Sequence, residues 1–302
     1  MNNNPLVAIL ITGSFRTFDK CLPTIYDNII SKNNSIVFFL IEGVWGPRII
    51  WDNINKFNIN IGWVMSSESY RDHNFNMIVE MIKNSDRKSL NKESFEKALT
   101  QPNNTVNWPS FGPNFIYNTS GSILQWYHLW LIWQRVLIYE RDNNVKFDSV
   151  IKIRTDCLIG KPIIVPTDNN FSLSSINPIL KDLDINNLLS INNCHGEPNS
   201  SNDNKITLDI IDNNINDKII SFGVDIVIMA SRNVFKVISN MVFYYGIYDS
   251  DCVIPFNSEN CFHQFCVNNN IVHYTIIDKN FPLYTKDVND KDKYIMIILR
   301  NH

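Results

Sequence analysis

The stretch LVAILITGSFRTFDKCLPTIYDNIISKNNSIVFFLIE, residues 6–42, decides the fold class. Leu6–Thr12 is an unbroken apolar and mostly β-branched run that ends at Gly13, which predicts a buried parallel strand followed by a tight turn. The spacing of the next apolar residues predicts a helix over Phe18–Ser31, and Ser35–Glu42 predicts a second strand. Strand, helix and strand in this order are typical of a parallel sheet wrapped by helices.

The rest of the chain continues this alternation. A long helix is predicted from Thr119 or Ser120 to about Glu140, with apolar side chains on most of its circumference. Further helices are expected at 51–57, 75–83, 92–99, 177–189, 231–245 (with Ser231 as its N-cap) and 257–269, and further strands at 59–65, 149–153, 218–221, 225–230, 271–277 and 294–299. These elements predict an α/β fold with a mostly parallel central sheet flanked by helices.

The chain contains no internal repeat and no clear linker, so residues 1–302 are expected to form a single domain. Residues 66–117 are more polar and contain three prolines, which suggests an insertion over the edge or the active face of the sheet. Residues 168–217 are polar and rich in asparagine, and we expect loop with short helices there.

Charge and composition exclude several classes of protein. Lys and Arg total 27 against 30 Asp and Glu, a net charge of -3, so the basic surplus of a nucleic-acid-binding protein is missing. The apolar run Leu6–Ile11 is too short for a signal peptide or a membrane span, which favours a soluble, cytoplasmic protein.

The abundance of asparagine and isoleucine indicates an AT-rich genome, such as that of a microbe, a protist or a large DNA virus. If the source is a virus, the expected location is the cytoplasm of the host.

A second stretch, FDSVIKIRTDCLIGKPI (residues 147–163), carries charges where a buried strand is predicted. Charged groups in such a strand are costly unless they are paired, liganded or exposed at its end. Asp156 just beyond the strand could hold a divalent cation that neutralises a departing diphosphate, with Arg154 stabilising the same group directly. The alternative is a structural ion pair of Arg154 with Asp156 or another acid. Lys152 is less well explained, and two interpretations are open: its ammonium extends to the surface, or it pairs with a neighbouring acid.

Gly13, Ser14 and Arg16 follow the first strand, where open α/β sheets bind ligands. Glycine lets the backbone approach a phosphate, and Arg16 could pair with a diphosphate in a bidentate way, although a plain turn with an exposed arginine is equally consistent. Two acids, Asp225 and Glu259, are available to act as a catalytic base, but Glu259 opens a helix and could be a simple cap.

Other motifs offer little support for rival chemistry. The three Asp-x-Asp triplets at 182–184, 249–251 and 290–292 are expected by chance in this chain, and the histidines show no metal-site spacing. The sequence contains no GxSxG motif, no Walker loop and no GxGxxG fingerprint. Hydrolase, NTPase and dehydrogenase functions therefore lose their sequence support.

The order of five blocks resembles a set of bacterial and large-virus glycosyltransferases, most closely the WavE lipopolysaccharide-synthesis family. The blocks are ILITGSFRTF, NTSGSILQWYHLW, FDSVIKIRTDCLIGKP, FGVDIVIMAS and NSENCFHQF. The resemblance implies a GT-A-like fold in which 1–160 is the half that binds the nucleotide-sugar and 161–302 is the acceptor-side half.

The resemblance also implies roles for individual residues. Gly13, Ser14, Arg16, Gln125, Arg154 and Asp156 would bind the donor, Asp156 would also hold Mn²⁺ or Mg²⁺, and Asp225 and Glu259 would be the catalytic acids. The Arg-x-Asp sequence replaces the usual Asp-x-Asp, which puts metal dependence in question. The expected activity is hexosyl or related transfer from a UDP-, GDP- or TDP-sugar to a glycan. The alternatives are a sugar nucleotidyltransferase and an inactive nucleotide- or glycan-binding module.

Overall fold

The computed structural model describes residues 4–42, 46–67, 73–84, 103–108, 112–165, 188–190, 218–222, 225–244, 258–278, 284–289 and 296–299. The amino-terminal part alternates strands with helices, as expected. Its elements are β1 (Val7–Ser14), α1 (Phe18–Asn28), the short 3₁₀ helix η1 (Ile30–Lys32), β2 (Ser35–Glu42), α2 (Gly46–Ile54) and β3 (Ile61–Ser67).

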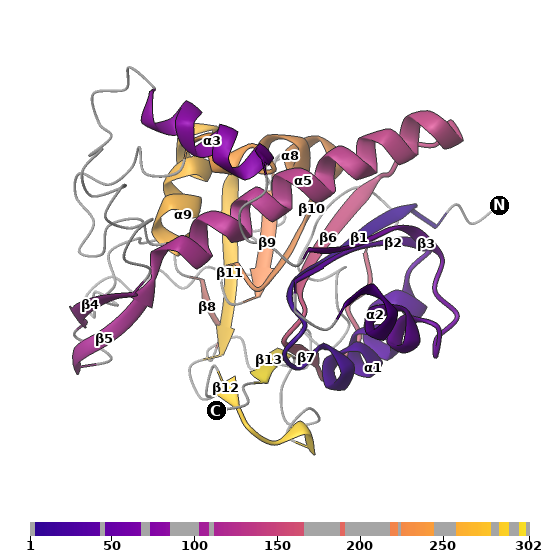
Figure 1. Ribbon diagram of the computed structural model, residues 1–302. Coiled ribbons are helices and arrows are strands. Elements are labelled where there is room, and N and C mark those ends of the chain that lie inside the picture. Colours follow the sequence, from indigo (N-terminus) through magenta and orange to yellow (C-terminus); the bar gives the residue numbers. More distant parts are fainter. Residues whose placement is uncertain are drawn as a thin grey trace.

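The middle of the chain is dominated by one long helix. A short helix, α3 (His73–Lys83), precedes a hairpin of β4 (Asn103–Trp108) and β5 (Gly112–Asn118). Strand β5 runs directly into α5 (Thr119–Asn143), from whose end the hairpin projects in Figure 1. Strands β6 (Ser149–Arg154) and β7 (Cys157–Ile159) follow.

The carboxyl-terminal part completes the central sheet. Its elements are β8 (Leu188–Ser190), β9 (Lys218–Phe222), β10 (Val227–Ser231), α8 (Arg232–Ile238), η4 (Met241–Tyr244), α9 (Ser258–Asn268), β11 (Val272–Asp278), β12 (Tyr284–Thr285) and β13 (Met296–Leu299). No helix in the described part of the chain has the length and apolar character needed to cross a bilayer.

Eight strands form the central sheet in the order β3-β2-β1-β6-β10-β9-β11-β8. Strands β3, β2, β1 and β6 pair in parallel, β10 is antiparallel to both neighbours, β11 is parallel to β9, and β8 is antiparallel to β11. The predicted α/β fold with a mostly parallel sheet and flanking helices is confirmed. Residues 1–160 and 161–302 both supply strands to this one sheet, whereas the single-domain organisation stays a prediction.

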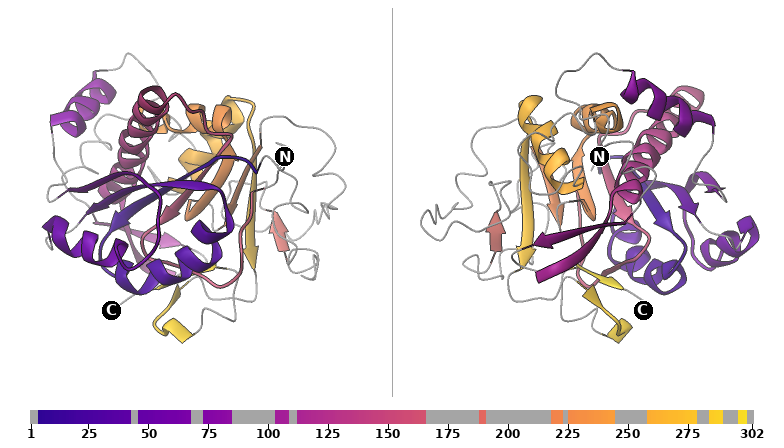
Figure 2. Two further views of the ribbon diagram at one scale, coloured as in Figure 1. Left: turned by 90° about the vertical axis from the view of Figure 1, so that its right-hand side faces the viewer. Right: turned by 60° about the vertical axis from the view of Figure 1, so that its left-hand side comes forward.

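Helices cover both faces of the sheet (Figures 1 and 2), and each face carries its own apolar core. On one face, α3, α5, α8 and α9 pack against alternate residues of the strands, such as Leu10, Phe38 and Val150. On the other face, α1 and α2 pack with β7 and β13 against the intervening residues, such as Ile9 and Ile151. This alternation follows from the two-residue period of a strand, and it places Lys152 and Arg154 on the face that α5 covers.

Several local predictions need correction. The helix expected at 51–57 is α2, which begins five residues earlier because a proline is tolerated in the first turn of a helix. The helix expected at 231–245 ends at Ile238, where the side chains of Ser239 and Asn240 both donate to the carbonyl of Lys236. The end of the region expected as helix at 177–189 is strand β8, which pairs with β11. The helix expected at 92–99 lies outside the described residues.

Candidate active site

The carboxyl ends of β1 and β6 are joined by Thr155. Its backbone N–H donates to the carbonyl of Thr12 at 3.2 Å, and its hydroxyl donates to the carbonyl of Ser14 at 2.6 Å. Gly13 lies against this threonine with φ of 136°, and a Cβ at position 13 would come within 2.6 Å of the Thr155 hydroxyl oxygen. Glycine is therefore required here for both its backbone conformation and its size. The contact of Gly13 with a nucleotide stays a prediction.

Arg154 and Asp156 form a bidentate ion pair beside this junction. Nε of Arg154 donates to Oδ1 of Asp156 at 2.9 Å, and a terminal guanidinium nitrogen donates to Oδ2 at 2.7 Å. The carboxylate is largely buried, with 12% of the Asp156 side chain exposed. This is the ion pair that the sequence left as one alternative, and it engages both oxygens of the expected metal ligand.

The expected divalent cation would have to bind at Asp156 beside the guanidinium of Arg154. No group of three His, Cys, Asp or Glu side chains in the described ranges is placed to hold a metal ion. Asp156 also has each carboxylate oxygen hydrogen-bonded to a guanidinium, which competes with metal coordination. The three Asp-x-Asp triplets lie outside the described residues. The metal role of Asp156 stays a prediction.

Asp225 is the centre of a buried polar network at the same edge of the sheet. It lies two residues before β10, and because β10 is antiparallel to β6, it lies beside the carboxyl end of β6. Gln125 of α5 donates to Oδ2 of Asp225 at 2.7 Å, and Ser258 at the start of α9 donates to the same oxygen at 3.1 Å. The indole N–H of Trp126 in turn donates to the Ser258 hydroxyl at 3.1 Å.

This network fixes one oxygen of a carboxylate that is only 6% exposed. Oδ1 of Asp225 has no hydrogen-bond donor among the described residues, so it is the oxygen that could accept a proton or bind a hydroxyl group. The structure thus joins Gln125 and Asp225, two candidate residues separated by 100 positions in the chain. The sequence did not single out Ser258, since an ordinary helix-opening serine gives the same pattern.

Lys152 lies beneath Asp225. Its side chain is fully buried, and Nζ donates to the main-chain carbonyl of Asp225. Burial lowers the pKa of Lys152 to about 8, while the nearby Asp225 and Asp156 carboxylates act in the opposite direction and Arg154 lowers it further. The interpretation in which Lys152 extends its ammonium to the surface is wrong, because the side chain is completely buried and its ammonium binds a main-chain carbonyl.

The remaining candidates are less tightly placed. Arg16 is exposed in the loop between β1 and α1, so it does not join the buried network. Glu259 is the second residue of α9, directly after Ser258, but its side chain lies outside the described part of the structure.

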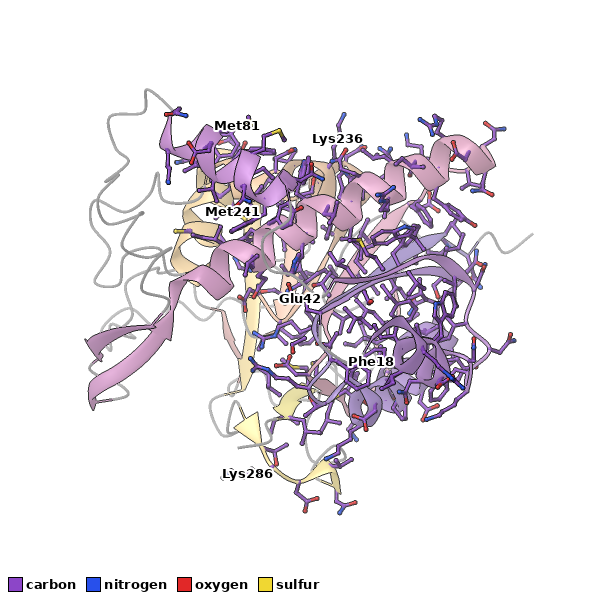
Figure 3. All side chains as sticks on the ribbon, viewed as in Figure 1. Phe18, Glu42, Met81, Lys236, Met241 and Lys286 are labelled. Carbon is purple, nitrogen blue, oxygen red and sulfur yellow. The ribbon has the colours of Figure 1, made fainter. Side chains whose placement is uncertain are left out.

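A further polar pair, absent from the sequence predictions, lies at the end of β2. Nε2 of His128 on α5 is 2.9 Å from Oε1 of Glu42, and both residues are buried. Glu42 is the register partner of Ser14, and Figure 3 shows it in the interior between α5 and the core that contains Phe18. His128 is one helical turn from Gln125, so one side of α5 carries polar residues toward this edge of the sheet.

Comparison with known proteins gives no family assignment. No protein-family model and no curated protein sequence matches the chain. Among solved structures, mouse xyloside xylosyltransferase 1 in its apo form is 6% identical, with 99% of this chain and 95% of that chain covered and a TM-score of 0.36. A transferase mutant with two cysteine-to-serine substitutions is 9% identical over 54% of this chain and 63% of its own, with a TM-score of 0.22. These scores are too low to bear on fold or activity, and the resemblance to the WavE family stays a prediction.

Proposed function

We propose that this protein is a glycosyltransferase that moves a sugar from a nucleotide-diphosphate-sugar to a glycan hydroxyl. The observation that carries the proposal is the hydrogen bond between Gln125 and Asp225. The two residues belong to separate blocks of the glycosyltransferase resemblance, and both lie at the edge of the sheet where α/β proteins bind ligands.

Asp225 is the proposed base of an inverting reaction. The acceptor oxygen forms a bond to the anomeric carbon and its proton passes to the Asp225 carboxylate. The bond from that carbon to the diphosphate oxygen breaks, and the nucleoside diphosphate leaves with the electron pair. Gln125 and Ser258 hold Oδ2 of the carboxylate, which leaves Oδ1 to receive the proton. Glu259 is the second candidate for this role.

The negative charge that develops on the diphosphate requires a cationic partner. Arg154 is the proposed partner, because it lies at the carboxyl end of β6 and guanidinium groups bind phosphate oxygens in a bidentate way. The main chain at Gly13 and Ser14, together with the exposed Arg16, is proposed to bind the nucleotide portion. A bound Mn²⁺ or Mg²⁺ would supply further positive charge, with Asp156 as the candidate ligand.

The carboxylate of Asp225 is tested by Asp225→Asn. We expect sugar transfer to fall by about 10²- to 10⁴-fold, the usual contribution of a general base, because an amide cannot accept the proton. The amide oxygen can still accept the hydrogen bonds of Gln125 and Ser258, so the melting temperature should change little. The measurement is steady-state transfer from a panel of UDP-, GDP- and TDP-sugars to glycan acceptors, with product stereochemistry determined by NMR.

Asp142→Asn is the matched control, because Asp142 is an exposed acid at the far end of α5. It should transfer sugar at the wild-type rate. Full activity in Asp225→Asn would remove Asp225 from the mechanism and leave Glu259 as the candidate.

The same panel separates the two alternative functions. A sugar nucleotidyltransferase would instead make the nucleotide-sugar from a nucleoside triphosphate and a sugar 1-phosphate, with release of pyrophosphate. A binding module would bind a donor or a glycan saturably without turnover. A protein that binds no donor and turns over no substrate would contradict all three assignments.

A further inference from the structure

Lys152 has an environment that apolar packing alone does not explain. It lies on β6 between Leu10 of β1 and Ile228 of β10, the register partners in the neighbouring strands. Its side chain is completely buried on the α5 face, where Val150, two residues earlier on the strand, is an ordinary core residue. A buried lysine destabilises a protein relative to an apolar residue of the same length. A role of Lys152 in the function of the protein would account for its presence.

Two features of the structure indicate what the role of Lys152 is. The ammonium donates a hydrogen bond to the main-chain carbonyl of Asp225, which anchors the turn that carries this carboxylate. The ammonium also lies close enough to the acidic side chains of Asp225 and Asp156 for their charges to stabilise it. The other groups that face it are the guanidinium of Arg154 and the thiol of Cys157. No other lysine in the described residues is fully buried.

We propose that Lys152 is the positioning residue of Asp225, which it holds in place through the main-chain carbonyl. This inference rests on the proposed function, in which Asp225 is the base. A base must be held at a fixed position relative to the hydroxyl group that it deprotonates. Gln125 and Ser258 hold the carboxylate of Asp225, and Lys152 holds its main chain from the inner side. The lysine itself never touches the substrate.

A second hydrogen bond from β6 holds the segment that precedes β10. The carbonyl of Ile226 accepts from the backbone N–H of Arg154 at 3.2 Å. The side chain of Lys152 and the backbone of Arg154 therefore bind consecutive carbonyl groups, those of Asp225 and Ile226. The strand that would bind the diphosphate thereby also positions the base.

The test is Lys152→Met, with Val150→Ala as the matched control on the same strand and face. Methionine keeps the length and apolar character of the side chain but removes the charge and the donor. We expect kcat for transfer to fall at least about 100-fold, with the donor KM nearly unchanged, because only the base is affected.

A purely structural role would change the melting temperature but leave kcat of the folded protein unchanged. Val150→Ala should lower the melting temperature and leave kcat and the donor KM unchanged. If Lys152→Met does not fold, Lys152→Gln carries the test, because it keeps a donor on a shorter side chain and should still lower kcat without changing the donor KM. Wild-type kcat in the folded variant would overturn the proposal.

Failure of the proposed function can be distinguished from failure of this inference. If the wild-type protein transfers no sugar from any donor, the proposed function fails, and amide hydrogen exchange in the 225–230 segment then decides the role of Lys152. Faster exchange in Lys152→Met than in Val150→Ala supports the anchoring of Asp225. Equal exchange in the two variants overturns it.

Discussion

The charged residues of β6 show how one strand can place three ionic groups in very different environments. Lys152 is fully buried under the sheet edge, Arg154 is partly exposed at the end of the strand, and Asp156 pairs with Arg154 just beyond it. Arg154 is the most exposed of the three, with 26% of its side chain accessible against 12% for Asp156. The cost of burial is therefore highest for Lys152, which makes the strand sensitive to pH at that residue.

Stability should rise with pH in a window set by Lys152. Burial lowers its pKa from the ordinary value of 10.5 to about 8, so between these values the unfolded chain binds more protons than the folded protein. The contribution of Lys152 to the free energy of unfolding should therefore increase by on the order of 3 kcal/mol as the pH rises from about 8 to 10.5. Urea unfolding at several pH values across that window measures the change.

Lys152→Met is the reference for this measurement, because methionine cannot titrate. The difference in unfolding free energy between the wild type and the variant should narrow as the pH rises. A constant difference from pH 7 to pH 10 would show that Lys152 titrates normally.

Residue-level predictions from the sequence were uneven for physical reasons. The sequence identified Arg154 and Asp156 as unusual, because charge in a buried strand is conspicuous, but it could not choose between a metal site and an ion pair. That choice depends on side-chain torsions and on which residues approach from elsewhere in the chain. The sequence did not predict roles for Ser258 or for the Glu42–His128 pair, because neither belongs to a recognisable motif of neighbouring residues.

At the scale of the elements, a second ion pair joins two helices. Glu140 near the end of α5 accepts two hydrogen bonds from Arg232 at the start of α8, both at 2.6 Å, and another from the backbone of Phe147 at 3.0 Å. Trp133 packs close to the same guanidinium, with its ring centre 5.9 Å away. The pair fixes the angle at which α8 leaves the sheet, because β10 ends at Ser231, directly before Arg232.

Glu140→Ala should destabilise the protein by about 3 kcal/mol, since it leaves the Arg232 guanidinium and the Phe147 N–H without their acceptor. The measurement is chemical denaturation near neutral pH. The control is Asp142→Ala, which removes an exposed acid two residues away and should change stability by less than about 0.5 kcal/mol. Equal effects of the two substitutions would contradict a structural role for Glu140.

The helices and strands that the sequence predicted well are those in which the pattern of apolar residues is long and unambiguous. Strands β1 and β2 are uninterrupted apolar runs, and α5 has a polar N-cap region followed by a long apolar stretch. Strands β7 and β12 were missed because they have three and two residues, too few for any period to appear. Strand β8 was missed because its conformation depends on pairing with β11, which local sequence does not encode.

At the scale of the whole molecule, the strand order assembles the candidate site from distant segments. The alternation of strands and helices predicted the class of sheet, but not that β10 would enter between β6 and β9 in the antiparallel direction. That direction brings Asp225 to the edge where β1 and β6 end. A parallel β10 would have placed Asp225 at the opposite edge of the sheet, away from Arg154.

Metal dependence can be tested on the intact protein through ligand-induced stabilisation. We expect a nucleoside diphosphate to raise the melting temperature in the presence of EDTA, because Arg16 and Arg154 supply positive charge near the phosphates without a metal ion. Thermal unfolding with and without nucleotide, in EDTA and in Mn²⁺, provides the measurement. Stabilisation that occurs only with Mn²⁺ would support the Asp156 metal site expected from the sequence.

The contact between Gly13 and Thr155 restricts how this chain can evolve. The two residues are 142 positions apart, yet a side chain on the first would collide with the hydroxyl of the second, and the φ of 136° already disfavours any residue except glycine. Replacement of Thr155 by a smaller residue would relieve the collision but not the backbone constraint. Homologous chains that keep this junction should therefore retain glycine at position 13 even where position 155 has changed.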